Sequence, residues 1–310
     1  MKPIPLIIDC DPGVDDAIAL LLAFAAPELR LLGITTVAGN VPLSLTSSNA
    51  RRICELAHRT DIPIYPGCPR PLLNALTTAA EVHGETGLTG ITLPEPTMAL
   101  QSVHAVDFII DTILNSAPPI TLATLGPLTN LAIALIKEPR IAQNIQQVVI
   151  MGGAITHGNI TPSAEFNIYC DPHAAHVVFT SNLPITLITL DVTHTAIATP
   201  KRLQNLRDRQ HPLCEAVANL LQSYGSYDQE RHGFEGAPLH DPCVIAYLTD
   251  PHLFRTRPCP ASIELQSPTS LGRTIIDWYN TSQNPKTINI ATTINAEAFF
   301  QMLGDRISGL

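Results

Sequence analysis

Residues 6–16 read LIIDCDPGVDD, and this stretch decides how the first part of the chain folds. Its three apolar residues have the character of a buried strand, and the Pro12-Gly13 pair is typical of a turn. The apolar run at residues 17–26 then predicts a helix. We therefore expect a strand, a turn and a helix, with acidic side chains at the carboxyl end of the strand, where open α/β sheets bind their ligands.

Four carboxylates fall within eight residues of this stretch, namely Asp9, Asp11, Asp15 and Asp16. Crowded carboxylates repel one another unless something neutralises them, and a hard cation with oxygen ligands is the simplest answer. The alternative is that Asp15 or Asp16 only caps the following helix, whose first turn favours anions. Capping needs a single acid, so the cluster favours a cation site.

Composition limits the class of protein. The chain has 310 residues, of which 45% are hydrophobic, and this length suits one large α/β domain or two small ones. The formal net charge of -9 disfavours a nucleic-acid-binding surface, which is normally basic. No apolar run is long enough to span a membrane and no signal peptide is visible, so no membrane partner is expected. The seven cysteines form no Cys-x-x-Cys pair and indicate reduced, mostly buried thiols of a cytoplasmic protein.

Strand-like and helical runs alternate along the rest of the chain, which predicts an α/β fold: a mostly parallel, Rossmann-like open sheet with helices on both faces. We see no repeat or linker and expect a single domain over residues 1–310. Residues 72–96 have weak periodicity and are expected to form an active-site loop. The later expected strands are residues 31–37, 62–65, 120–123, 148–150, 185–190, 261–266 and 287–292. The later expected helical runs are residues 47–58, 103–114, 128–136, 172–179, 200–227 and 296–303.

Further polar motifs follow the predicted strands. They are Gly39-Asn40, the stretch LGPLTN at residues 125–130, the stretch from Met151-Gly152-Gly153 to Glu165-Phe166-Asn167, and His240-Asp241-Pro242. On its own, Asn40 is a common turn residue with local hydrogen bonds. The His-Asp-Pro sequence fits a helix start, because proline is favoured at the first helical position.

Together these motifs resemble the calcium-dependent nucleoside hydrolases, the inosine-uridine preferring family, and most closely its pyrimidine-specific ribonucleoside hydrolases. The similarity begins with residues 9–16 and extends over nearly the whole chain. It implies hydrolysis of the N-glycosidic bond of ribonucleosides to free base and ribose, with Ca²⁺ as cofactor. It also implies a small-molecule nucleoside partner and a homo-oligomer, either a tetramer or a dimer.

The resemblance also assigns residues. Asp11 is implied as the general base, and His240 as a catalytic residue beside the nucleobase. The implied metal ligands are Asp11, Asp16, the Leu125 carbonyl and Asp241, with leucine at position 125 where relatives commonly have threonine. The implied substrate-binding residues are Asp15, Asn40, His83, Met151, Asn159, Glu165, Phe166, Asn167, His240 and Asp241. The remaining histidines, such as His173 and His194, are expected to be structural.

Base preference and two other protein classes stay open. Residues 233–240, GFEGAPLH, resemble the pyrimidine-preferring members, while a nonspecific or purine-preferring hydrolase is the alternative. A phosphatase with Asp9 as nucleophile would also begin with a strand and Asp-x-Asp, but no phosphate-binding Lys or Arg stands in any of the motifs. A non-catalytic calcium-binding protein would lack the sugar-binding set of Asn159, Glu165 and Asn167.

Overall fold

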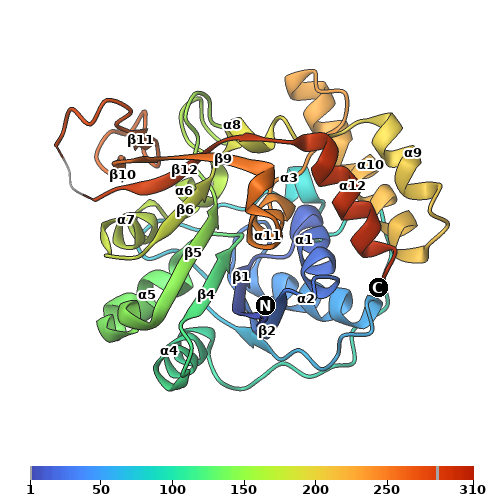
Figure 1. Ribbon diagram of the computed structural model, residues 1–310, viewed down its shortest axis with the longest axis horizontal. Helices are drawn as coiled ribbons and strands as arrows, with labels where there is room; N and C mark the ends of the chain where they lie inside the picture. The colour runs from blue at the N-terminus through green and yellow to red at the C-terminus, as the bar shows by residue number, and fades with distance from the viewer. Residues whose placement is uncertain (1, 284–285) are drawn as a thin grey trace.

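One eight-stranded sheet organises the computed structural model, which describes residues 2–283 and 286–310. Its strand order is β3-β2-β1-β4-β5-β6-β12-β9 (Figure 1). All neighbouring strands are parallel except β9, which is antiparallel to β12. The strands of this sheet are β1 (Ile4–Cys10), β2 (Leu29–Thr36), β3 (Ile64–Pro66), β4 (Ile120–Thr124), β5 (Ile145–Met151), β6 (Ile185–Ile188), β9 (Phe254–Cys259) and β12 (Ile288–Ile294).

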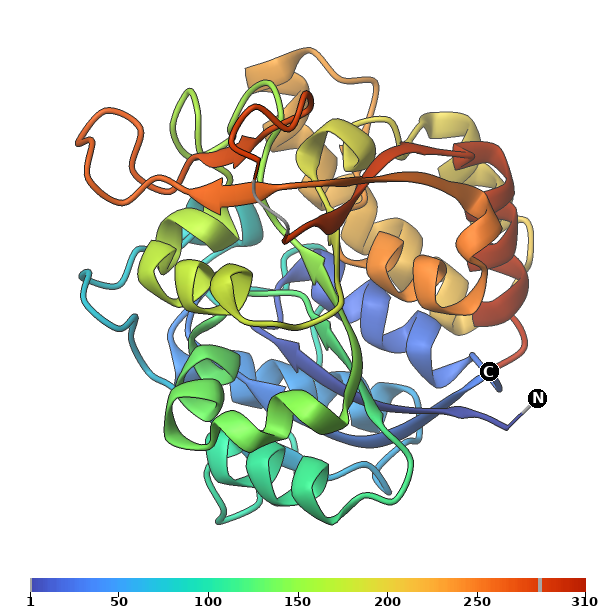
Figure 2. The same cartoon turned by 60° about the vertical axis from the view of Figure 1, so that its left-hand side comes forward.

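Helices cover both faces of the sheet. Figures 1 and 2 show α1, α10, α11 and α12 on one side and α4, α5 and α7 on the other. Each face has its own hydrophobic core, one containing Leu20 and Ile245 and the other containing Ile109, Leu131 and Val178. The helices are α1 (Val14–Phe24), α2 (Leu43–Leu56), α3 (Ala80–His83), α4 (Ala105–Asn115), α5 (Thr129–Lys137), α6 (Phe166–Cys170), α7 (Pro172–Thr180), α8 (Leu190–Thr193), α9 (Pro200–Arg207), α10 (Pro212–His232), α11 (Pro242–Thr249) and α12 (Ala296–Ile307).

The strand order reverses direction between β1 and β4. The chain adds β2 and β3 on one side of β1, then crosses over and adds β4, β5 and β6 on the other side. Such a reversal leaves a crevice beyond the carboxyl ends of the two central strands, and this is where open α/β sheets bind ligands. The backbone N–H of Leu125, directly after β4, donates to the Asp9 carbonyl of β1 over 2.8 Å. The predicted acidic stretch therefore stands at this reversal.

The predicted fold class is confirmed, and the differences lie in the carboxyl-terminal third and at element ends. Residues 200–227, expected to be mostly helical, form α9 and α10, and Pro212 is the first residue of the second helix, a position where proline is favoured. The expected strand at residues 185–190 ends at Ile188. Two short antiparallel pairs lie outside the main sheet: β7 (Ile197–Ala198) with β8 (Ala237–Pro238), and β10 (Ala261–Ile263) with β11 (Thr274–Ile276).

Candidate active site

The acid-bearing turn between β1 and α1, residues 11–16, is held by its own carboxylates. Asp16 accepts the backbone N–H of Gly13 over 2.9 Å and that of Asp11 over 3.1 Å. Asp16 thereby caps α1 at its positive end, where carboxylates are favoured. The side-chain amide of Asn40 also donates to Asp16, over 3.1 Å. The turn is therefore held both by its own carboxylate and by hydrogen bonds with Asn40.

Three buried carboxylates converge at this turn. Asp15, Asp16 and Asp241 each offer an oxygen, and these oxygens lie within 4.8 Å of one another. Asp241 comes from the residue before α11, so the cluster joins two parts of the chain that are far apart in sequence. Burial raises the pKa of the Asp15 carboxyl to about 8, with the Asp16 charge adding to the effect. Burial and then the neighbouring acids likewise raise the pKa of Asp241.

Asp11 stands beside the three acids in a narrow slot between two glycines. A Cβ at Gly39 or Gly126 would lie within about 2.2 Å of an Asp11 oxygen, so larger residues would displace the carboxylate. Its Oδ2 accepts the backbone N–H of Asn40 over 2.7 Å. Its Oδ1 is buried and has no hydrogen-bond partner in the described part of the chain. Burial, followed by the Asp16 charge, raises the pKa of Asp11 well above its usual range.

These residues fit a hard divalent cation. Buried carboxylates that repel one another, and one orphaned carboxylate oxygen, are features that a bound cation resolves. The three grouped residues all offer carboxylate oxygens, which suits Ca²⁺ or Mg²⁺ and disfavours softer metals. The Leu125 carbonyl also faces the pocket, where it accepts the side-chain amide of Asn167 over 2.6 Å.

Asp9, the first of the four acids, is neither in the Asp15–Asp16–Asp241 group nor among the residues that line the pocket. Its Oδ1 accepts from the Thr35 hydroxyl over 2.6 Å and from the Asn130 amide over 2.8 Å. Burial raises the pKa of Asp9 to about 6. Because Asn130 also accepts the backbone N–H of Cys68, Asp9 belongs to a network that ties β1 to neighbouring segments.

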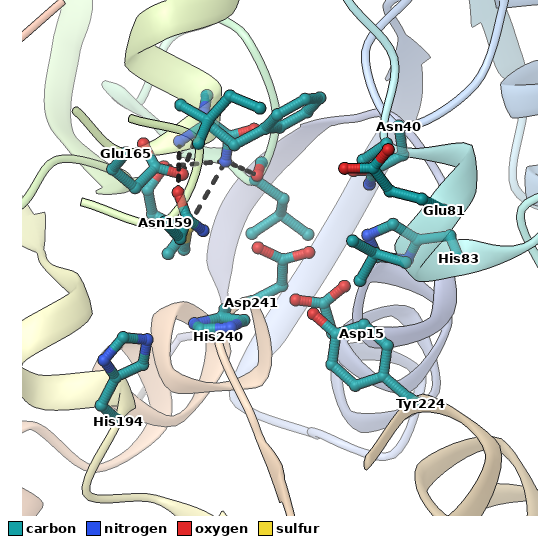
Figure 3. A pocket seen from close by; sticks show the side chains of 17 residues that line it. Asp15, Asn40, Glu81, His83, Asn159, Glu165, His194, Tyr224, His240 and Asp241 are labelled. Carbon is teal, nitrogen blue, oxygen red and sulfur yellow. Dashed lines mark hydrogen bonds between the residues drawn. The ribbon is translucent and has the colours of Figure 1, made fainter. Parts of the chain in front are cut away.

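A second wall of the pocket carries Asn159 and Glu165 (Figure 3). Asn167 also lines the pocket. Glu165 accepts three backbone N–H groups, from Gly153, Asn167 and Ile168, over 2.9 to 3.1 Å. It is the N-cap of α6, and this geometry fixes the carboxylate within the wall. Asn159 accepts the Phe166 backbone N–H through its side-chain oxygen over 2.9 Å, which leaves its amide N–H₂ for a ligand.

The histidines lie away from this wall, on the other sides of the pocket (Figure 3). His83 accepts the backbone N–H of Val14 at its Nδ1 over 3.1 Å. His240 pairs its Nδ1 with the Thr193 hydroxyl over 2.7 Å. Burial lowers the pKa of His83 to about 3, and burial followed by the neighbouring histidines lowers that of His240. Asp15 and Asp241 lie near the centre of the view, with His240 and His194 on one side of them and His83 on the other (Figure 3).

The structure brings the sequence-predicted residues together with few exceptions. Those that line the pocket are Asp15, Asn40, His83, Leu125, Met151, Asn159, Glu165, Phe166, Asn167, His240 and Asp241. Asp11 and Asp16 lie directly behind it, in contact with Asn40. The loop expected at residues 72–96 contributes through α3, which carries His83.

Sequence reasoning missed six lining residues: Ala79, Glu81, Val82, Ile160, His194 and Tyr224. His194, which was expected to be structural, lines the pocket, and its ring lies 5.7 Å from that of His240. Tyr224 packs its ring 5.2 Å from His83. Neither has a sequence signal, since each reaches the pocket from a helix end or helix face that tertiary packing directs there. Glu81 could have been found from its place two residues before His83.

Comparison with known proteins decides the family. The family model described as inosine-uridine preferring nucleoside hydrolase matches residues 6–301. The chain belongs to this family. Nucleoside hydrolases cleave nucleosides, and the chain is accordingly an enzyme of this class with a nucleoside as substrate.

Individual nucleoside hydrolases resemble the chain over nearly its full length. The pyrimidine-specific ribonucleoside hydrolase RihA of Photobacterium profundum is 45% identical over 305 residues, covering 98% of each chain. RihA of Escherichia coli O8 is 43% identical over 305 residues, again with 98% of each chain covered. The structure of a purine-preferring ribonucleoside hydrolase from Gardnerella vaginalis matches with a TM-score of 0.92 at 33% identity and covers 98% of both chains.

Nucleoside hydrolases are generally metal-dependent, and the buried acidic cluster agrees with this property. No helix among residues 2–283 and 286–310 combines the length and the apolar character needed to cross a lipid bilayer. All seven cysteines are buried and free, as the sequence predicts.

Proposed function

We propose that the chain hydrolyses the N-glycosidic bond of pyrimidine ribonucleosides such as uridine and cytidine, with Ca²⁺ held by its acidic cluster. The observation that carries the proposal is the convergence of three buried acids with the orphaned Oδ1 of Asp11. Opposite them, Glu165 and Asn167 offer hydrogen-bonding groups suited to sugar hydroxyls. His83 and His240 line the same pocket and would face the nucleobase, so groups for the metal, the sugar and the base lie together.

The proposed ligands of the cation are Asp11, Asp16, Asp241 and the Leu125 carbonyl, with Asp15 beside them. When bound, a hard cation supplies positive charge that keeps these acids ionised and makes nearby water more acidic. Calcium rather than magnesium is favoured because it tolerates crowded, irregular oxygen ligands, whereas Mg²⁺ demands near-octahedral geometry.

Asp11 is the proposed general base. Its Oδ2 is fixed by the Asn40 backbone N–H, so its Oδ1 is the atom left to accept a proton from the attacking water. A carboxylate held in place by one oxygen is oriented for proton transfer at the other, and positioned bases contribute about 10² to 10⁴-fold to rate. The slot between Gly39 and Gly126 prevents the carboxylate from turning away.

Asp15, Asn40, Asn159, Glu165 and Asn167 are the proposed ribose-binding residues. Glycosidic cleavage passes through a transition state with positive charge on the sugar, resembling an oxocarbenium ion. The carboxylates of Asp15 and Glu165 stabilise that charge, because both are buried where water screens them little. Phe166 and Met151 supply the apolar contacts of the same wall.

His240 is the proposed group that assists departure of the base. A pyrimidine leaves with negative charge delocalised onto a ring carbonyl, and a hydrogen-bond donor near that oxygen accelerates departure. The pyrimidine preference is supported by the RihA relatives, which are 43–45% identical, while the purine-preferring structural neighbour is 33% identical. Residues 233–240 also resemble the pyrimidine-preferring members.

A phosphatase with Asp9 as nucleophile is disfavoured, because Asp9 is bound to Thr35 and Asn130 rather than turned to the pocket. We further propose that residues 1–310 form one domain, which assembles as a tetramer or dimer. The seven free cysteines favour a cytoplasmic location. Light scattering of the purified protein measures its assembly.

A panel of nucleosides assayed for released reducing sugar tests the function. We expect uridine and cytidine to be cleaved faster than inosine and adenosine. Faster release of ribose from inosine would replace the pyrimidine proposal with a purine-preferring enzyme. Release of phosphate from a generic ester without release of ribose from any nucleoside would contradict the function altogether.

A further inference from the structure

Residues 79–87, here called the histidine arm, carry His83 across the acid-bearing turn. The start of the arm is bound to the loop after β2, because the backbone N–H of Ala79 donates to the Asn40 carbonyl over 2.9 Å. Its middle is tied to α1 by the Val14 N–H donated to His83. The far end of the arm also lies against the acid-bearing turn, because a Cβ at Gly87 would be 3.3 Å from the Pro12 carbonyl oxygen.

Asn49 provides this third tie. It lies fully buried in α2, and its Nδ2 donates to the Pro12 carbonyl over 3.0 Å and to the Thr86 carbonyl over 2.7 Å. Pro12 belongs to the acid-bearing turn, and Thr86 belongs to the histidine arm. The two N–H bonds of the amide are thus used to join the two segments, while Oδ1 has no hydrogen-bond partner among the described residues.

Two glycines make this close approach possible. Gly87 has φ +86, and a Cβ there would lie 2.7 Å from Nδ2 of Asn49. A Cβ at Gly13 would lie 2.5 Å from Nδ1 of His83. Both hydrogen bonds between the arm and the acid-bearing turn therefore lie beside a glycine. A side chain at either glycine would push the two segments apart.

The link through Asn49 matters because it helps to fix the position of a hydrogen-bond donor, the ring N–H of His83. His83 Nδ1 accepts a hydrogen bond from Val14, so the proton of the neutral ring is on Nε2. Burial lowers the pKa of His83 to about 3, which keeps the ring neutral in the usual assay range. His83 lines the pocket with one ring N–H to donate, and the value of this N–H to a leaving base depends on its position.

We propose that Asn49 is a positioning residue, which sets where the His83 N–H stands relative to the bound nucleoside without touching the nucleoside. The inference rests on the proposed base-side role of His83. Loss of the Asn49 amide also removes the bond to Pro12, but the acids of the turn keep their bonds to Asp11, Gly13 and Asn40, so we expect them to stay in place. The far end of the arm loses its link, so the base side is affected and the sugar side is not.

The test is Asn49→Ala, measured on uridine and on p-nitrophenyl riboside, whose leaving group needs no donor. We expect kcat/KM for uridine to fall about 10- to 100-fold, as a displacement of about 1 Å produces, with little change for p-nitrophenyl riboside. The matched control is Ser47→Ala, which removes a buried hydrogen bond from the same helix, to Thr36 over 2.8 Å, and leaves the arm alone. Ser47→Ala should leave kcat/KM unchanged for both substrates.

A double variant separates positioning from folding. In a His83→Ala background, the further change Asn49→Ala should lower kcat/KM for uridine little more, because the donor that Asn49 positions is already absent. Equal losses on both substrates, or fully additive losses in the double variant, would overturn the inference. If His83→Ala alone leaves uridine hydrolysis unchanged, the base-side role and the inference both fail. If His83→Ala is impaired and Asn49→Ala is not, the inference alone fails.

Should Asn49→Ala fail to fold, Gly87→Ala tests the same tie from the other side. The added methyl group would press on Nδ2 of Asn49 from a strained backbone conformation. The expected pattern is the same selective loss on uridine. Unchanged uridine hydrolysis in a folded Gly87→Ala protein would also overturn the inference.

Discussion

Asp11 and Asn40 are joined by a 2.7 Å hydrogen bond from the Asn40 backbone N–H to Oδ2 of Asp11. The bond leaves Oδ1 of Asp11 buried beside three other acids, without a hydrogen-bond partner in the described residues. This division of the carboxylate into one held oxygen and one available oxygen underlies the proposed chemistry, because it distinguishes Asp11 from an acid that only caps a helix.

Replacing the available oxygen should stop the reaction. In Asp11→Asn the side chain can no longer accept a proton, and kcat for uridine should fall by about 10² to 10⁴-fold. Metal analysis of the purified variant should also find less calcium. Asp9→Asn is the matched control, since its amide oxygen can still accept from Thr35 and Asn130, and it should retain most activity. Normal turnover with full calcium occupancy in Asp11→Asn would rule out the mechanism.

Glu165 should matter to turnover as well as to affinity. In Glu165→Gln an amide N–H₂ replaces one of the oxygens that accept from Gly153, Asn167 and Ile168. We expect kcat to fall about 10- to 100-fold, matching about 1.5–3 kcal/mol for a hydrogen bond to a charged group. Binding of ribose should weaken in parallel, measured as product inhibition. A change confined to base preference would contradict the sugar-binding assignment.

Metal removal should change the pH dependence of stability. The folded protein raises the pKa of Asp15 to about 8, whereas the unfolded value is about 4. Protons therefore bind the folded state more tightly, and the metal-free protein should lose stability as pH rises from 6.5 to 8. Calcium reverses this by favouring the ionised acids, so its effect on Tm should be greatest at pH 8. Thermal unfolding with and without chelator measures this, and a chelated protein that gains stability over this range would contradict it.

His240 should matter most for substrates whose leaving group is poor. In His240→Ala we expect turnover of uridine to fall about 10² to 10⁴-fold, and that of p-nitrophenyl riboside to change far less. Thr193→Val, which removes the hydroxyl bonded to Nδ1, should show a weaker form of the same pattern. If His240 only packs beside Asp241, both substrates should lose rate to the same extent.

The strand, turn and helix around the first acids could be predicted because each is local. A few neighbouring residues are enough to identify each of them: the apolar run of β1, the Pro12-Gly13 turn and the carboxylates at the start of α1. The position of Asp9 away from the pocket could not be predicted this way. It depends on hydrogen bonds from Thr35 and Asn130, which come close to Asp9 only in the folded sheet.

The base side of the pocket was less accessible to sequence reasoning. His194 and Tyr224 carry no motif of their own, and their place at the pocket follows from how α8 and α10 pack. The edge strand β9 was missed for a different reason. Its four central residues are exposed and include two arginines, so it lacks the alternating apolar pattern of a half-buried strand.

Calcium-dependent cleavage of uridine is the most direct test of the account. Protein stripped of metal with a chelator, and verified as metal-free, is assayed for ribose released from uridine before and after calcium or magnesium is returned. We predict negligible release without metal, full recovery with stoichiometric calcium and weaker recovery with magnesium. Undiminished release of ribose by the metal-free protein would contradict the claim that Asp11, Asp16 and Asp241 work by holding a cation.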